Sequence, residues 1–142
     1  MKDINILFVG VGGQGVILAS DAVSEIGMNA GYDVKKTDSL GMAQRGGSVV
    51  SNIRWGQEVF SPLIKKGEVD FLLSFEEVEA ARWAAYLKPE GVAIVADVVI
   101  TPISSMSGVI PYPGWDEIRT ILAHYTDKIH LISATRIGEE VN

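Results

Sequence analysis

The 142-residue sequence contains no cysteine. The absence of thiols excludes disulfides, thiolate zinc sites, a cysteine nucleophile and any cysteine-ligated iron–sulfur cluster within this chain. Histidine is scarce as well: His124 and His130 are the only two, and no carboxylate pattern accompanies them at metal-ligand spacing. We therefore expect no metal site in this chain, and we expect both histidines to be structural or surface residues.

Basic residues are in the minority, because 12 lysines and arginines stand against 18 aspartates and glutamates, for a net charge of −6. This balance argues against a nucleic-acid partner, which requires a broad basic surface. Long apolar runs are missing too. The run at residues 4–9 is too short to span a membrane and has no signal-peptide cleavage pattern, so we expect no membrane partner and a cytoplasmic location.

Apolar residues make up 47% of the chain, which is enough for a substantial core in a single domain. They recur at alternating strand and helix periods. These patterns predict strands at residues 4–9, 32–37, 49–55, 58–60, 69–73, 92–96 and 128–132, and helices at 16–30, 61–66, 74–87, 116–125 and 135–141.

Two of the predicted strands form an antiparallel pair. Residues 49–55 and 58–60 flank Gly56–Gln57, which suits a two-residue hairpin turn. The other strands alternate with helices, as strands of parallel sheets do. The predicted fold class is α/β, a Rossmann-like three-layer α-β-α sandwich whose mostly parallel sheet carries an added antiparallel hairpin.

A glycine motif lies between the first predicted strand and the first predicted helix. Gly10, Gly12 and Gly15 satisfy the spacing G-x-G-x-x-G. In dinucleotide-binding proteins such a turn presents backbone N–H groups at a helix N-terminus to a phosphate. Asp38, at the end of the second predicted strand, has the position of the acidic residue that binds a ribose hydroxyl.

The same glycines can serve only a tight turn and close packing of a helix on a sheet. The additional Gly13 and Gln14 are not typical of a nicotinamide site, and Lys35 and Lys36 precede Asp38. Nucleotide binding and a purely structural turn therefore both remain open on the residues alone.

A second glycine-rich stretch covers residues 40–48, with three glycines around Gln44 and Arg45. We interpret it as a loop with one cation and several free N–H groups, which suits an anion or the backbone of a partner. A solvated loop that needs glycine for positive φ angles is the alternative.

Other side chains carry no catalytic pattern. Glu76, Glu77 and Glu79 are predicted to form a solvated helix face, with a weak i,i+3 pair between Glu79 and Arg82. The serines near residue 105 lack a histidine spaced to activate them, so we predict no catalytic residue. Six aromatic residues offer a partner surface, although Trp83 and Tyr86 suit core packing: Trp55, Phe60, Trp83, Tyr86, Tyr112 and Trp115.

Two stretches of the sequence resemble a known family. They are residues 6–16, ILFVGVGGQGV, and residues 38–51, DSLGMAQRGGSVVS. In this order they resemble the gamma-type domain of 2-oxoacid:ferredoxin oxidoreductases, and among these the beta subunits of indolepyruvate ferredoxin oxidoreductases. The resemblance covers nearly the whole chain and implies one gamma-type domain over residues 1–142. Family members continue through further helix, so we expect this domain to be truncated at its C-terminus.

The resemblance implies a subunit of an enzyme that oxidatively decarboxylates a 2-oxoacid, of the indolepyruvate or aryl-pyruvate type, to an acyl-CoA with electrons passing to ferredoxin. It places thiamine diphosphate, magnesium and the iron–sulfur clusters on a larger partner subunit, with coenzyme A as co-substrate. The isolated chain is expected to be inactive and to bind no cofactor firmly. A homodimer of the chain is a further option.

With the resemblance in place, we expect residues 12–15 and 44–47 to lie at strand ends, where they line the subunit interface or hold an anionic part of coenzyme A. Together with Gly10 and Asp38 of the glycine motif, the expected cofactor-binding residues are Gly10, Gly12, Gly13, Gln14, Gly15, Asp38, Gln44, Arg45, Gly46 and Gly47. A stand-alone NAD(P)-binding oxidoreductase and a non-catalytic assembly module are the two alternatives.

Overall fold

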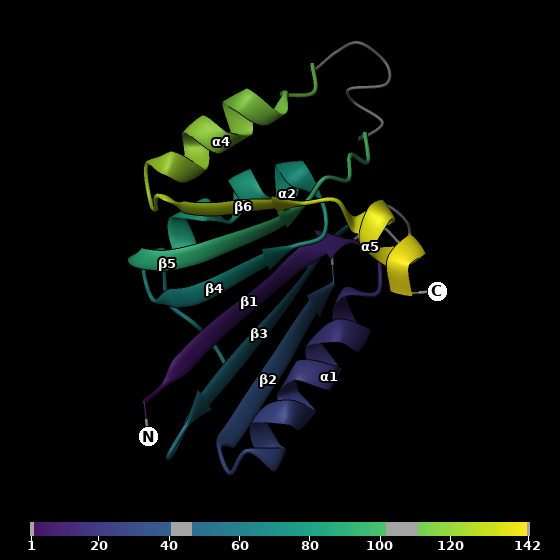
Figure 1. The fold of residues 1–142 in the computed structure, drawn as a ribbon. Helices are drawn as coiled ribbons and strands as arrows, with labels where there is room; N and C mark the ends of the chain where they lie inside the picture. The colour runs from purple at the N-terminus through teal and green to yellow at the C-terminus, as the bar shows by residue number, and fades with distance from the viewer. Residues whose placement is uncertain (1, 41–46, 102–110, 142) are drawn as a thin grey trace.

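The computed structural model describes residues 2–40, 47–101 and 111–141. One sheet of six strands runs through it in the order β2-β3-β1-β4-β5-β6 (Figure 1). The strands are β1 (Ile4–Val11), β2 (Asp33–Leu40), β3 (Ser48–Gly56), β4 (Val69–Ser74), β5 (Leu87–Ala96) and β6 (Lys128–Ile132). The helices are α1 (Val16–Asn29), α2 (Glu77–Arg82), the 3-10 turn η1 (Ala84–Tyr86), α4 (Trp115–Ala123) and α5 (Ala134–Val141).

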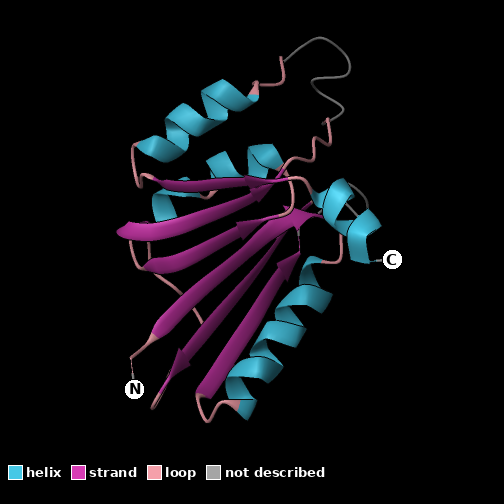
Figure 2. Ribbon diagram, in the orientation of Figure 1, coloured by secondary structure: helices cyan, strands magenta, loops and turns pink. Residues whose placement is uncertain are grey.

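Helices pack on both faces of the sheet (Figure 2). The alternation of side chains along β1 separates the two faces, as the strand period of two requires. Leu7 and Val9 belong to the core cluster that includes residues of α2 and α4. Ile6 and Phe8 belong to a second cluster, which packs against α1. The prediction of an α/β sandwich with helices on both faces is therefore confirmed.

The antiparallel part of the sheet differs from the prediction. β3 lies between β2 and β1 and pairs antiparallel with both, whereas β1, β4, β5 and β6 are parallel. The predicted hairpin with residues 58–60 is wrong, because both edges of β3 already have partners. Instead, the Val59 N–H donates to Oδ2 of Asp33 at 2.8 Å, and the Val59 side chain is buried.

The short helix predicted at residues 61–66 is also wrong, since this segment is irregular. Its backbone groups bind side chains of β3 instead of forming helical hydrogen bonds. The Ser61 carbonyl accepts a 3.0 Å hydrogen bond from Arg54, and the Ile64 N–H donates to the Asn52 side chain at 3.2 Å.

The helix predicted at residues 74–87 is shorter than expected. Ser74 is the last residue of β4, and the N-cap of α2 is Glu76, whose Oε1 accepts from the Glu79 N–H at 3.0 Å. The helix ends at Arg82, and η1 follows after Trp83. None of the helices among the described residues has the length and apolar character that crossing a membrane requires.

Candidate functional site

The predicted glycine motif lies at the carboxyl edge of the parallel strands, where α/β sheets bind ligands. Gly10 is in β1, and Gly15 is the N-cap of α1, with a φ of 83°. The structure brings this turn next to the second glycine-rich stretch, since the Gly12 N–H donates to the Gly47 carbonyl at 2.9 Å. Gln44, Arg45 and Gly46 lie outside the described residues.

The glycines of the motif serve different purposes. A Cβ atom on Gly10 would lie 2.6 Å from Cγ2 of Val16 and 3.0 Å from Cβ of Phe75, so Gly10 permits α1 to pack closely on the sheet. Gly13 and Gly15 have φ angles of +94° and +83°, and a Cβ atom on either would meet no atom of residues 2–40, 47–101 and 111–141 within 4 Å. These two glycines therefore provide the left-handed backbone of the turn.

Gln14 explains why the turn carries an additional residue pair. Its Oε1 accepts a hydrogen bond from the Val11 N–H at 2.8 Å, and its Nε2 donates to the Phe75 carbonyl at 2.7 Å. Both ends of the amide are thus used to fasten the β1–α1 turn to the junction between β4 and α2. The geometry gives Gln14 a structural role, and its predicted contact with a ligand stays a prediction.

A small cavity of about 170 Å³ borders the turn and the end of the β2–β3 pair. Most of its lining is aliphatic, and two of the lining side chains are strongly exposed: Leu18 at 76% and Leu40 at 67%. The first N–H groups of α1 have no intrahelical partner, and the N-cap residue Gly15 has no side chain that could cap them. The surface therefore combines an apolar pocket with a few backbone donors. The lining residues are Val11, Gly12, Gly13, Gly15, Val16, Ile17, Leu18, Leu40 and Val49.

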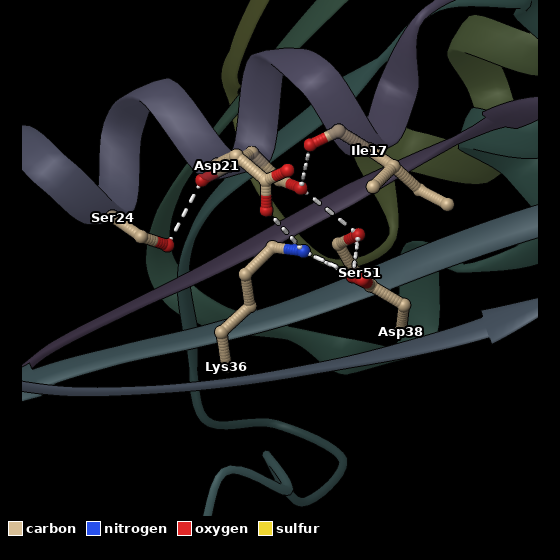
Figure 3. A network of polar contacts seen from close by, with 7 residues as sticks. Ile17, Asp21, Ser24, Lys36, Asp38 and Ser51 are labelled. Carbon is tan, nitrogen blue, oxygen red and sulfur yellow. Dashed lines mark hydrogen bonds and ion pairs between the residues drawn. The ribbon is translucent and has the colours of Figure 1, made fainter.

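Asp38 belongs to a polar network beneath α1 (Figure 3). Its carboxylate lies 2.5 and 2.7 Å from Nζ of Lys36, and Oδ1 accepts a 2.5 Å hydrogen bond from the Ser51 hydroxyl. Nζ of Lys36 also lies 2.9 Å from Oδ1 of Asp21 on α1. The fully buried Ser20 continues the network by donating to Oγ of Ser51 at 3.1 Å. The network joins β2 and β3 to α1.

The network favours the ionised forms of Asp38 and Lys36. Burial raises the pKa of Asp38, but the hydrogen bonds from Lys36 and Ser51 outweigh it, and the pKa lies below its usual value. Burial likewise opposes the charge of Lys36, yet the two carboxylates at its Nζ raise its pKa. A ribose hydroxyl would have to share the Asp38 carboxylate with Lys36 and Ser51, and Lys36 already neutralises its charge, which makes the nucleotide-binding interpretation of the motif less favourable.

Three glutamates at the start of α2 contradict the predicted solvated face. Glu76, Glu77 and Glu79 are 1%, 7% and 5% exposed. Oε2 of Glu76 accepts from the Ile100 N–H at 3.1 Å and from the Tyr112 hydroxyl at 2.6 Å. Because these partners lie 24 and 36 residues away, no local pattern in the sequence could indicate the burial.

Burial in this region raises the pKa values of Glu77 and of the Tyr112 hydroxyl. Burial raises the pKa of Glu77, and the nearby charges of Glu76 and Asp97 raise it further. Burial and the hydrogen bond to Glu76 raise the pKa of the Tyr112 hydroxyl. The predicted pair between Glu79 and Arg82 is present, with 3.6 Å between Oε1 and Nε.

The remaining sequence predictions concern histidines and aromatic residues. His124 and His130 are exposed, and no group of three potential metal ligands occurs within residues 2–40, 47–101 and 111–141. Trp83 and Tyr86 pack against the core with ring centroids 5.1 Å apart, as expected. Phe60, in contrast, is 86% exposed. The serines near residue 105 lie outside the described residues.

The chain is similar to known proteins in its sequence and in its fold. The family model described as pyruvate ferredoxin/flavodoxin oxidoreductase matches residues 5–142. The indolepyruvate oxidoreductase subunit IorB of Thermococcus kodakarensis is 38% identical over 122 residues, which are 86% of this chain and 60% of that protein. The IorB subunit of Archaeoglobus fulgidus is 38% identical over 137 residues, or 96% and 68% of the two chains. The chain thus spans about 60–68% of the length of these relatives.

Solved structures share the fold. Subunit PORC of the pyruvate oxidoreductase from Thermotoga maritima has a TM-score of 0.69 at 21% identity, covering 99% of this chain and 67% of that one. The gamma subunit of a keto/oxoacid ferredoxin oxidoreductase from Geobacter sulfurreducens has a TM-score of 0.57 at 26% identity, covering 72% and 55%. Together with the match over residues 5–142, these findings confirm the resemblance, and the chain belongs to the pyruvate ferredoxin/flavodoxin oxidoreductase family.

Proposed function

We propose that this chain is the small subunit of a 2-oxoacid:ferredoxin oxidoreductase. The enzyme would oxidatively decarboxylate an aryl-2-oxoacid such as indolepyruvate to its acyl-CoA and pass the electrons to ferredoxin. The observation that carries the proposal is the family match over residues 5–142, with relatives that are named as subunits. The site geometry agrees with a supporting role, since the polar side chains described at the carboxyl edge hydrogen-bond one another, as Gln14 does with the Val11 N–H and the Phe75 carbonyl.

The cofactors of such an enzyme do not fit the residues of this chain. A cysteine-ligated iron–sulfur cluster requires thiolates, and the sequence has none. Among the described residues, no three histidine, aspartate or glutamate side chains gather as metal ligands. In the proposal, a larger partner subunit holds thiamine diphosphate, magnesium and the clusters, and thiamine diphosphate supplies the electron sink for the carbanion there.

The contribution of this chain is a surface for that partner. The cavity beside the glycine-rich turn is lined mainly by aliphatic side chains, and Leu18 and Leu40 extend into solvent at its rim. An apolar side chain of the larger subunit would remove these groups from water, which is favourable by roughly 25 cal/mol for each Å² of apolar surface buried. The turn would then lie within the subunit interface.

Binding of an anionic part of coenzyme A is a second role for the same turn. It is supported by the open space at Gly13 and Gly15 and by the uncapped first turn of α1. The N–H of Gly12 is already bound to the Gly47 carbonyl, which leaves the α1 amides as the donors. An oxoglutarate:ferredoxin oxidoreductase from Magnetococcus marinus, which shares this fold with a TM-score of 0.64 at 16% identity, has been solved with coenzyme A bound.

Co-purification tests the proposal most directly. A tagged chain expressed in its natural host should bring down a larger protein that contains iron, sulfide and thiamine diphosphate. The reconstituted pair should reduce ferredoxin with a 2-oxoacid and coenzyme A, while neither protein alone should do so. Oxidation of a 2-oxoacid by the isolated chain would contradict the proposal. Separately, the molecular mass of the isolated chain in solution would show whether it forms a homodimer.

Two further measurements separate the finer roles. Arg45→Ala in the reconstituted pair should raise the apparent KM for coenzyme A if the second glycine-rich stretch binds the anion, and an unchanged KM and kcat would remove that role.

Titration of the isolated chain with NADH should give no change in fluorescence, because the carboxylate of Asp38 is already paired with Lys36 and Ser51.

A further inference from the structure

A buried carboxylate on α2 reaches the second glycine-rich stretch. Oε2 of Glu79 accepts a hydrogen bond from the hydroxyl of Ser48, the first residue of β3. The Glu79 side chain is buried, although the Arg82 guanidinium beside its other oxygen is 55% exposed. A surface i,i+3 pair needs no burial and stabilises a helix only weakly. The contact with Ser48 is therefore the feature that accounts for the position of this carboxylate.

Ser48 is the neighbour of a residue that binds the glycine-rich turn directly. Gly47 precedes Ser48, and its carbonyl accepts the Gly12 N–H at 2.9 Å. A hydrogen bond to a charged acceptor is about twice as strong as one between neutral groups. Ser48 pairs with Val11 at the end of the β1–β3 ladder, and its side-chain bond to Glu79 adds a second restraint next to the Gly47 carbonyl that binds the Gly12 N–H.

The backbone of Glu79 is in turn fixed by the buried side chain of Glu76. Its backbone N–H donates to Oε1 of the fully buried Glu76, whose other oxygen accepts from Ile100 and Tyr112. The turn also has a second support from the same region, through the hydrogen bond between Gln14 and the Phe75 carbonyl. Both supports of the turn therefore start at the junction of β4 and α2.

We propose that Glu79 is a positioning residue, which sets the conformation of the glycine-rich turn through Ser48 and the Gly47 carbonyl. The inference rests on the proposed function in one respect: the turn thus positioned is the surface that meets the larger subunit or the anionic co-substrate. Removal of Glu79 would leave Gly47 held only by the end of the β1–β3 ladder and loosen Gly12, while β1 and α1 stay in place through Gln14.

Amide hydrogen exchange at Gly12 tests the positioning on the isolated full-length chain. Ser48→Ala and Glu79→Ala should each raise the exchange rate of the Gly12 amide about fivefold to tenfold, the effect of losing one hydrogen bond. Ser48→Thr keeps the hydroxyl and should retain wild-type exchange. Arg82→Ala removes the exposed partner of the same carboxylate and should also leave Gly12 unchanged. Equal exchange in Ser48→Ala and wild type would overturn the inference.

The reconstituted pair supplies the functional readout. Ser48→Ala should raise the apparent KM for coenzyme A, or the Kd for the larger subunit, by about fivefold or more with a smaller change in kcat. Ser48→Thr should restore both values. If the wild-type pair shows no activity, the proposed function fails while the exchange result at Gly12 still stands. If the wild-type pair is active and Ser48→Ala matches it in KM and Kd, the inference about Glu79 fails alone.

Discussion

The hydroxyl group of Tyr112 donates a 2.6 Å hydrogen bond to Oε2 of Glu76, across 36 residues of chain. Glu76 is almost fully buried, and it has hydrogen-bond donors instead of a cation around it. Burying a carboxylate is costly unless its oxygens are hydrogen-bonded. The pair therefore joins the segment before α4 to the start of α2.

Tyr112→Phe should lower the free energy of unfolding by about 1–2 kcal/mol, because Glu76 loses one of its charge-assisted hydrogen bonds. Glu76→Ala should cost more, about 3 kcal/mol, since two N–H groups and a hydroxyl lose their acceptor. Urea denaturation measures both values. Tyr125→Phe, on a half-exposed side chain, is the matched control and should stay within about 0.5 kcal/mol of wild type. Equal values for the two tyrosine variants would contradict the prediction.

Glu77 should make the chain less stable as the pH rises. Its folded-state pKa is raised by burial and by Glu76 and Asp97, so the native state binds a proton more tightly than the unfolded state. The free energy of unfolding should therefore fall as the pH rises from the ordinary value of 4.5 through the raised pKa. Glu77→Gln removes this loss and should be more stable than wild type at pH 7, with a smaller difference at pH 4.

Urea titrations at a series of pH values measure this dependence. Glu117→Gln, on the exposed face of α4, removes the same charge from the chain and serves as the control. A Glu77→Gln curve that stays parallel to wild type between pH 4 and 7 would show that burial of Glu77 does not perturb its titration.

Lys36 should stabilise the fold more than its neighbour Lys35. Lys36 bridges Asp21 and Asp38 with its side chain 15% exposed, whereas the Lys35 side chain is 45% exposed and pairs with Asp33. Lys36→Met should cost about 2 kcal/mol, between the values for exposed and fully buried pairs. Lys35→Met should leave the urea midpoint unchanged. The effect at Lys36 should also persist in 1 M salt, and its loss there would indicate a solvent-screened pair.

The two lysines illustrate what the sequence could and could not reveal. The elements β1, α1, β2, β4 and β6 follow from local apolar periodicity, and their predicted ranges agree with the structure to within a few residues. The pairing of Lys36 with Asp38 is also local, because residues i and i+2 of a strand share a face. The second ion pair of Lys36, with Asp21, depends on how α1 packs on the sheet, and no local sequence pattern predicts it.

Two of the wrong predictions, the hairpin and the solvated face of α2, share one physical cause, which is pairing over long sequence distances. Gly56–Gln57 suited a hairpin turn, but β3 instead pairs with β2 and with β1, whose paired residues lie 37 (Val11↔Ser48) to 51 (Ile4↔Trp55) positions earlier in the chain. The acidic start of α2 had the composition of a solvated face. Its burial is set by Ser48, Ile100 and Tyr112, which only the tertiary fold brings close.

The glycines of the turn should respond differently to the same substitutions. At Gly10 the obstacle is space, so alanine should cost about 1–3 kcal/mol through overpacking against Val16. At Gly15 the obstacle is the positive φ, so alanine should cost about 1 kcal/mol. Asparagine, which tolerates left-handed backbone, should be milder than alanine at Gly15 and worse than alanine at Gly10. Urea midpoints of the four variants test this reversal, and the same order at both sites would contradict it.

Leu18 should matter for the partner and hardly at all for the fold. Its side chain is 76% exposed at the rim of the cavity beside the glycine-rich turn, so it contributes little to the core. Leu18→Ser should change the free energy of unfolding by less than about 0.5 kcal/mol. If the larger subunit covers the cavity, as proposed, the same variant should weaken its binding about tenfold. Ile26→Ser, 59% exposed near the other end of α1, removes a similar side chain and should bind like wild type. Equal losses in both variants would place the interface along the whole helix, and no loss in Leu18→Ser would move it away from the glycine-rich turn.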